Sequence, residues 1–179
     1  MTLSFRTARS DDVEGILHIQ RRAFLEIGSA FYGEALMREA MEAVTLFTPD
    51  LIDEGHYFVA EAEGKLIATG GWSQSLPAYA AAMGGGAAAN GTTAIVRSVY
   101  VCPDHARKGV GRRMMEYLEQ DARLAGITRL TMTATLPGVP LYRRMGYRES
   151  GRDPAVLPSG NVVELIGMER ELTKCDLAA

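Results

Sequence analysis

The stretch from residue 94 to residue 125 constrains the fold most, because it joins an expected strand, a basic glycine-containing turn and an expected helix. An apolar run over 94–101 predicts a strand that stops before Pro103. A helix over 109–125 follows from apolar residues spaced four apart. Those residues are Val110, Met114, Leu118 and Ala122.

The turn between that strand and that helix has the features of an anion site. The first N–H groups of a helix lack partners within the helix, and its dipole favours a negative charge there. Glycine also lets a ligand come close to the backbone. The sequence therefore predicts a phosphate-binding turn. Its candidate residues are Arg107, Lys108, Gly109, Val110, Gly111 and Arg112.

Two common phosphate loops do not match this turn. A nucleotide-triphosphatase loop requires Gly-Lys-Ser or Gly-Lys-Thr at a fixed spacing after another glycine, and the sequence lacks it. A dinucleotide fingerprint requires a third glycine where Met114 stands, with an acidic residue about 20 positions further on. Both of these nucleotide classes are therefore disfavoured.

The turn and a later segment together resemble the GNAT superfamily of acyl-CoA-dependent N-acetyltransferases. Its strand ending Val-x-Pro is matched by Val101-Cys102-Pro103, and its Gly-x-Gly helix start by Gly109-Val110-Gly111. A second element, Leu-Tyr-x-x-x-Gly-Tyr, is matched at residues 141–147. The chain departs from the family at Ala106, where Arg or Gln is usual, and Arg107 stands one position later.

The resemblance implies acetyl-CoA as cofactor, bound where two strands splay apart, one ending at Val101 and the other spanning 130–135. It places the donor for the thioester oxygen among the backbone N–H groups of Val99, Tyr100 and Val101, at a bulge. It assigns Tyr142 to protonate the leaving sulfur, since a phenol keeps its proton at neutral pH. Thr135, where the family often has Asn, and Arg143 are expected to contact the cofactor.

The acceptor is expected to be a primary amine of a small molecule or a peptide, which must lose a proton before attack. Phe31, Tyr32 and Arg97 are the candidate acceptor residues. The sequence does not single out a general base. It leaves Glu34, Glu39, His56, Glu61, His105 and Glu164 open, as well as a water path to solvent.

The rest of the chain predicts an α+β (α/β) domain over 1–179, with a central, mixed, mostly antiparallel sheet of six to seven strands and about four helices. Strands are expected at 2–9, 56–63, 66–72, 94–101, 130–135, from 147, and at 162–168. Helices are expected at 10–25, 33–47, 109–125 and 139–145, with a break at Gly28-Ser29 and a turn at 154–161. Residues 73–93, rich in Ala and Gly, are interpreted as a flexible insertion between two strands of a hairpin.

Composition narrows the class of protein further. The formal net charge of -3 argues against a nucleic-acid partner, and two distant cysteines indicate a reducing compartment. Because no apolar run is long enough for a signal peptide or a membrane span, a cytoplasmic protein is expected. Neither a membrane partner nor a metal site is expected, and pairing of the last strand or the sheet edges makes a homodimer conceivable. The alternative function is a non-catalytic acyl-CoA-binding or regulatory module.

Overall fold

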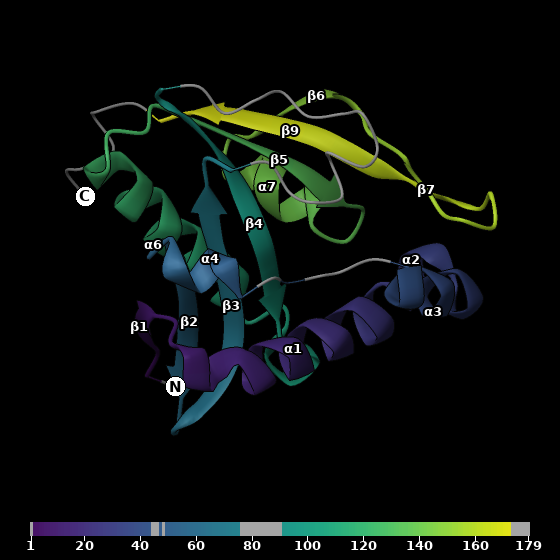
Figure 1. Cartoon of the computed structure of the whole chain (residues 1–179), viewed down its shortest axis with the longest axis horizontal. Helices are drawn as coiled ribbons and strands as arrows, with labels where there is room; N and C mark the ends of the chain where they lie inside the picture. Colours follow the sequence, from purple (N-terminus) through teal and green to yellow (C-terminus); the bar gives the residue numbers. More distant parts are fainter. Residues whose placement is uncertain (1, 44–46, 48, 76–90, 173–179) are drawn as a thin grey trace.

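In the computed structural model, which describes residues 2–43, 47, 49–75 and 91–172, seven strands form one mixed sheet in the order β1-β2-β3-β4-β5-β9-β6 (Figure 1). The strands are β1 (Ser4–Thr7), β2 (Tyr57–Ala62), β3 (Lys65–Ser73), β4 (Thr93–Val101), β5 (Arg129–Thr135), β6 (Arg148–Arg152) and β9 (Leu165–Glu171). Strands β4 and β5 are parallel, and the other neighbouring pairs in this sheet are antiparallel. The predicted fold class is thus confirmed.

Helices cover both faces of the sheet. They are α1 (Val13–Arg22), α2 (Ser29–Tyr32), α3 (Glu34–Ala43), α4 (Asp50–Asp53), α6 (Val110–Leu124) and α7 (Val139–Arg144). Alternate residues of β2 face opposite sides, as a strand requires. Phe58 packs in the core beneath α6, whereas Tyr57 and Val59 pack in the core beneath α1 and α4. Strand β2 is therefore apolar on both faces and does not show the alternation of a half-exposed strand.

The expected helix break at Gly28-Ser29 is wrong. The chain leaves α1 through a π-helical turn, η2 (Ala23–Ile27), and Gly28 keeps a helical φ of -62° on its way into α2. The turn comes instead at Gly33, whose φ is +85°. A Cβ on Gly28 would clash with the Phe24 carbonyl oxygen and lie 2.8 Å from Met37 Sδ, so this glycine permits both the local backbone path and the close packing of α3.

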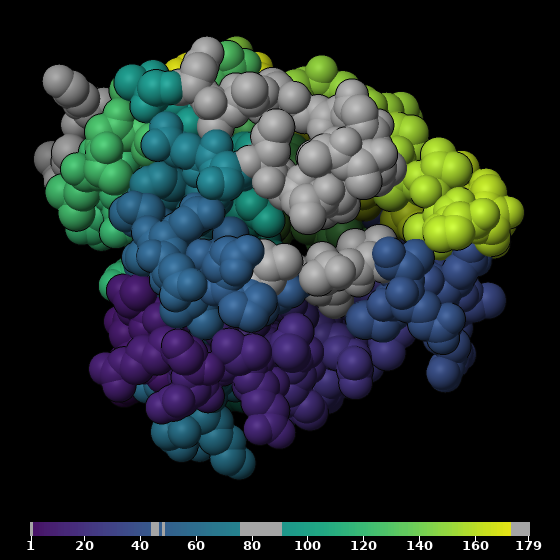
Figure 2. All heavy atoms as spheres, viewed as in Figure 1, coloured from purple at the N-terminus to yellow at the C-terminus, as the bar shows by residue number. Residues whose placement is uncertain are grey.

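The predicted turn at 154–161 includes a short strand, β7 (Ala155–Val156), which pairs with β8 (Val162–Val163) just after it to form a small ribbon. The apolar side chains of Leu157 and Val163 in this hairpin pack with Met37 and Ala40 of α3. Figure 2 shows the hairpin region in yellow-green lying against the blue atoms of the region that contains α3. The last strand is therefore not continuous from 162; β9 begins at Leu165.

Two further expectations concern the free edges of the sheet and the strands that flank the insertion. Strand β9 lies between β5 and β6, so the last strand offers no free edge for a partner chain; β1 and β6 are the outer strands of the described sheet. Strands β3 and β4 pair as an antiparallel hairpin, as expected of the strands that flank the insertion. Residues 76–90 of that insertion, and 44–46 of the expected second helix, lie outside the described residues.

Candidate active site

Strands β4 and β5 diverge and leave a cavity between them. They pair through only three Cα partners among the described residues, from Thr93↔Arg129 to Ile95↔Thr131, although both strands continue well beyond them. The opening holds a cavity of about 80 Å³. It is lined by Val96, Ser98, Val99, Tyr100, Met132, Thr133, Ala134, Thr135 and Tyr142. Of the predicted site residues, Val99, Tyr100, Thr135 and Tyr142 are therefore brought together.

A β-bulge bends β4 at this cavity. Thr69 pairs with Tyr100 and Gly71 with Arg97, so Ser98 and Val99 stand opposite the single residue Gly70. Ser98 has a φ of +50°, which is uncommon for a residue with a side chain. The bulge expected from the resemblance is thus present, and it turns the backbone of β4 within the cavity wall.

The turn before α6 has the geometry of an anion site at its first residues. Gly109 is the N-cap of α6 with a φ of +81°, and Arg107 has a φ of +60°. Arg107, Lys108 and Gly109 are exposed, and the space around a Cβ on Gly109 is open. Successive residues in left-handed and ordinary conformations make concave arrangements of N–H groups that hold anions.

Gly111 and Arg112, the next predicted cofactor residues, also make contacts within the protein. A Cβ on Gly111 would face Leu141 Cδ2 at 3.3 Å and Val101 Cγ2 at 3.5 Å, so its small size serves packing between α6, α7 and β4. Arg112 pairs with Glu116 at 2.7 Å on the exposed face of α6. Val110 is 1% exposed and packs in the core, so its side chain serves the fold.

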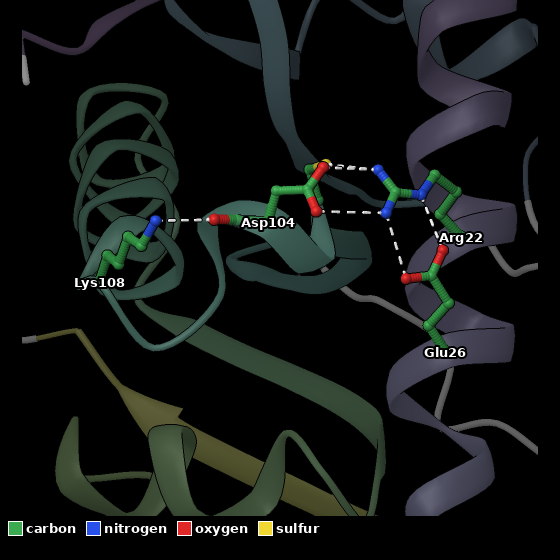
Figure 3. A network of polar contacts seen from close by, with 5 residues as sticks. Arg22, Glu26, Asp104 and Lys108 are labelled. Carbon is green, nitrogen blue, oxygen red and sulfur yellow. Dashed lines mark hydrogen bonds and ion pairs between the residues drawn. The ribbon is translucent and has the colours of Figure 1, made fainter.

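Residues Arg22 and Asp104, which the sequence did not single out, anchor the turn (Figure 3). Arg22 Nη1 of α1 donates to Asp104 Oδ2 at 2.8 Å, and Glu26 Oε1 pairs with Arg22 Nε at 2.7 Å. The Arg22 guanidinium holds the pKa of the Asp104 carboxyl below its usual range, so this carboxylate is charged and paired beside the turn. Lys108 Nζ donates to the Asp104 carbonyl at 2.8 Å.

Tyr142 is buried in the wall of the cavity, and burial raises the pKa of its phenol to about 12. A Cβ on Gly138, the N-cap of α7, would lie 2.7 Å from Tyr142 Cε2. Glycine at 138 therefore lets the ring occupy this place. Arg143, the next residue along α7, is exposed and pairs with Glu149 of β6.

The candidate acceptor residues are spread over several elements. Tyr32 Oη accepts from the Leu136 N–H and donates to the Glu164 carbonyl, both at 2.7 Å, so it ties α2 to the segments after β5 and before β9. Phe31 is 51% exposed, and Arg97 Nη1 donates to the Ser75 carbonyl at 3.3 Å. The cavity lining includes none of these three.

No candidate base lies in the cavity wall. The six residues left open by the sequence, Glu34, Glu39, His56, Glu61, His105 and Glu164, are all absent from its lining. His56, for example, bonds to Asp121 at 2.8 Å and stacks on Trp72. Within the described ranges, no cluster of His, Cys, Asp or Glu suits a metal ion, and no helix there is long and apolar enough to cross a membrane.

Comparison with known proteins places this geometry in context. The model of the acetyltransferase (GNAT) family matches residues 16–147. A search of curated proteins found no match.

Solved structures share the fold at low sequence identity. A GCN5-related N-acetyltransferase from Rhodopseudomonas palustris superimposes with a TM-score of 0.71 at 18% identity, over 96% of this chain and 97% of that one. A ribosomal-protein-alanine N-acetyltransferase from Brucella melitensis gives 0.66 at 21% identity, over 94% and 99%. A putative acetyltransferase from Salmonella typhimurium, solved with its cofactor acetyl-CoA, gives 0.64 at 19% identity, over 97% and 96%.

Proposed function

The chain belongs to the acetyltransferase (GNAT) family, and we propose that it transfers an acetyl group from acetyl-CoA to a primary amine of a small molecule or a peptide by direct attack on the thioester. The observation that carries this proposal is a coincidence of three features. The bulge of β4 lies in the wall of the cavity between β4 and β5, and the same strand leads directly into the turn at the N-terminus of α6.

The residues present fit acetyl-CoA. An exposed turn with left-handed Arg107 and Gly109 suits the pyrophosphate, because the N–H groups and the positive charges meet at one helix end. The cavity of about 80 Å³ suits the acetyl thioester rather than the whole cofactor. For scale, a cavity of about 150 Å³ accommodates benzene. Acetyl-CoA supplies the activated acetyl group, and the Salmonella typhimurium structure with acetyl-CoA supports this assignment.

The bulge supplies the donor for the thioester oxygen in this proposal. The oxygen gains negative charge as the amine attacks, and a donor fixed in advance stabilises that charge at no cost of reorganisation. Val99 and Tyr100 lie in the cavity wall at the bulge, so their backbone N–H groups are the candidates.

Tyr142 stabilises the departing sulfur by donating a hydrogen bond. Because burial raises the pKa of Tyr142 to about 12, well above the reference pKa of a thiol near 8.5, full transfer of its proton to the thiolate is unfavourable. The phenol therefore acts mainly as a donor to the developing charge. The proton that finally neutralises the thiolate then comes from the reacting amine or from solvent.

Removal of the amine proton is assigned to water. Carboxylates and imidazoles are missing from the described lining of the cavity, which favours entry of the amine in its neutral form or loss of the proton to water. The same observation favours a second candidate function, an acyl-CoA-binding module without turnover. The two differ in a single measurable property, acetyl transfer.

We also propose a reducing, cytoplasmic setting, because Cys102 is a free, buried thiol beside the anion site. Its Sγ lies 3.4 Å from Arg22 Nη1, so oxidation would disturb the anchor of the turn.

The first experiment is calorimetric titration with acetyl-CoA, with dephospho-CoA and NAD as controls, followed by CoA-release assays on amino acids, polyamines, aminoglycosides and peptides. We expect micromolar binding of acetyl-CoA and turnover that rises with pH as the amine loses its proton. Binding without turnover on any amine would support the non-catalytic module. A lack of binding at millimolar acetyl-CoA would refute both functions.

A further inference from the structure

A chain of buried polar groups leads from α1 to the bulge in β4. Gln20 Nε2 donates to Tyr57 Oη at 3.0 Å, and Tyr57 Oη lies 2.9 Å from Thr69 Oγ1. Both hydroxyls also lie within hydrogen-bonding distance of the Ser98 carbonyl oxygen, at 3.2 Å from Tyr57 and 3.1 Å from Thr69. The three side chains are at most 1% exposed. They connect three elements to one carbonyl group.

These polar groups lie among apolar side chains. Tyr57 packs with Ile16, Phe47 and Val59, where a phenylalanine would bury the same ring without a hydroxyl. A buried hydroxyl is costly unless it is hydrogen-bonded. Each hydroxyl has one proton, and Gln20 Nε2 already donates to Tyr57 Oη. With the Gln20 amide in this orientation, every arrangement that uses both hydroxyl protons within this chain donates at least one of them to the Ser98 oxygen. That oxygen is therefore the end point of the chain.

The Ser98 carbonyl and the Val99 N–H belong to one peptide group. The described peptides include no cis bond, so this group is planar and trans, and its N–H points opposite to its C=O. The carbonyl faces the side chains of β2 and β3. The Val99 N–H therefore points away from these side chains, and Val99 is one of the residues that line the cavity.

We propose that Tyr57 and Thr69 are positioning residues for acetyl transfer: their hydroxyls fix and polarise the Ser98–Val99 peptide, so that its N–H is aimed at the thioester oxygen as a strengthened donor. Hydrogen bonds to a carbonyl strengthen the N–H of the same peptide through polarisation. They also hold Ser98 at its φ of +50°. The role in catalysis rests on the proposed function, whereas the polarisation of the peptide does not.

Burial keeps the Tyr57 hydroxyl protonated, as a hydrogen-bond donor requires. It raises the pKa of the Tyr57 phenol far above its usual value, against smaller opposing effects of its hydrogen bonds and of the charge on Arg97. The hydroxyl therefore stays protonated as a donor throughout the range in which the enzyme would be assayed. A pH profile of the wild type should show no ionisation of Tyr57.

The test compares Thr69→Val and Tyr57→Phe, singly and together, with two matched controls. Thr69→Ser keeps the hydroxyl and loses only a methyl group. Thr131→Val makes the same change as Thr69→Val at a threonine whose Oγ1 donates to the Ala94 carbonyl, where β4 still pairs with β5. Equilibrium unfolding of every variant separates a loss of stability from a loss of donor strength.

The first readout is the amide proton shift of Val99 in the free protein. We expect it to move upfield in Thr69→Val and further in the double variant, and to stay in place in both controls. The second readout is the split between kcat and KM. We expect kcat to fall about 3- to 10-fold for each hydroxyl removed, with the KM for acetyl-CoA unchanged. Thr69→Ser should keep nearly full kcat.

The outcomes are distinguishable. An unmoved Val99 amide in the double variant overturns the polarisation itself, whether or not the protein is an enzyme. A moved amide with an unchanged kcat overturns the catalytic role. If the Val99 amide moves in the variants but the wild-type protein acetylates no amine, the proposed function and the catalytic role are both refuted, and only the polarisation of the peptide remains.

Discussion

Replacing Gly109 by alanine tests whether the left-handed residue at the start of α6 is needed for the cofactor or only for the fold. Its φ of +81° is a conformation that costs an L-residue about 1–2 kcal/mol. Contacts add nothing to this cost, because no atom lies within 4 Å of the alanine Cβ position. Gly126, just beyond the other end of α6, has a φ of +84° and equally open surroundings, so Gly126→Ala is a matched control.

The strain divides between stability and affinity in a way that can be measured. If the turn relaxes in the free Gly109→Ala protein, binding of acetyl-CoA must restore the left-handed residue, and the relaxed part of the cost appears as lost affinity. The two losses should then add up to about 1–2 kcal/mol, or about 5- to 30-fold in Kd if all of it appears there. Gly126→Ala should lose about the same free energy entirely as stability, about 2–8 °C in Tm.

Calorimetric titration with acetyl-CoA gives the loss of affinity of each variant, and thermal unfolding gives the loss of stability of each. The reasoning would be refuted by a Gly126→Ala protein that loses as much affinity as Gly109→Ala. It would also be refuted by a Gly109→Ala protein whose two losses sum to nearly zero, since the left-handed conformation would then carry no cost.

Three other predictions follow from buried groups. Tyr142→Phe should lower kcat about tenfold with little change in the Kd of acetyl-CoA, because one hydrogen bond to the departing sulfur is lost; an unchanged kcat in steady-state assays would remove Tyr142 from the reaction. Glu119→Ala should cost about 3–5 kcal/mol in urea unfolding, because Glu119 is 3% exposed and its carboxylate accepts from Arg170 at 2.8 Å and from Tyr147 Oη at 3.0 Å, so its removal breaks several buried contacts at once. A cost below about 1 kcal/mol would contradict a buried ion pair. The hydrogen bond from Arg6 lowers the pKa of Asp12 below its ordinary value near 3.8, so its stabilisation is present above about pH 4 and is lost as the pH falls through the lower folded value. Arg6→Met should therefore be less stable than the wild type at pH 6, and the two proteins should become equally stable near pH 2. A difference in unfolding free energy that is the same at both pH values would argue against this linkage.

The sequence predicted the local parts of the site and missed the parts made by distant residues. The strand, the turn and the helix from β4 to α6 are contiguous, so their periodicity and glycines were sufficient. Tyr142 was identified through a family resemblance, and its burial could not be read from the chain. Arg22 and Asp104 are 82 positions apart, and an arginine in the last turn of a helix has an ordinary explanation.

The conformation of Ser98 within the bulge shows the same limit more sharply. Ser98 gives no local sign of a positive φ, because the cause lies in the register of β3 against β4 and in two hydroxyls from other strands. Gly28 misled in the opposite direction. Glycine usually marks the end of a helix, yet here the missing side chain admits Met37 of a neighbouring helix. Tertiary contacts decided both positions.

The parallel pairing of β4 with β5 has a consequence for how the molecule could be divided. Parallel neighbours need a long connection, and here it is residues 102–128, which contain both α6 and the basic turn. A chain cut after α6 would give one fragment with β1 to β4 and another with β5, β6 and β9, each retaining its own antiparallel pairs. The fragments would meet along three pairs of residues in the sheet, and a cofactor seated between them would act as a clamp. Acetyl-CoA should then promote complementation of a split enzyme.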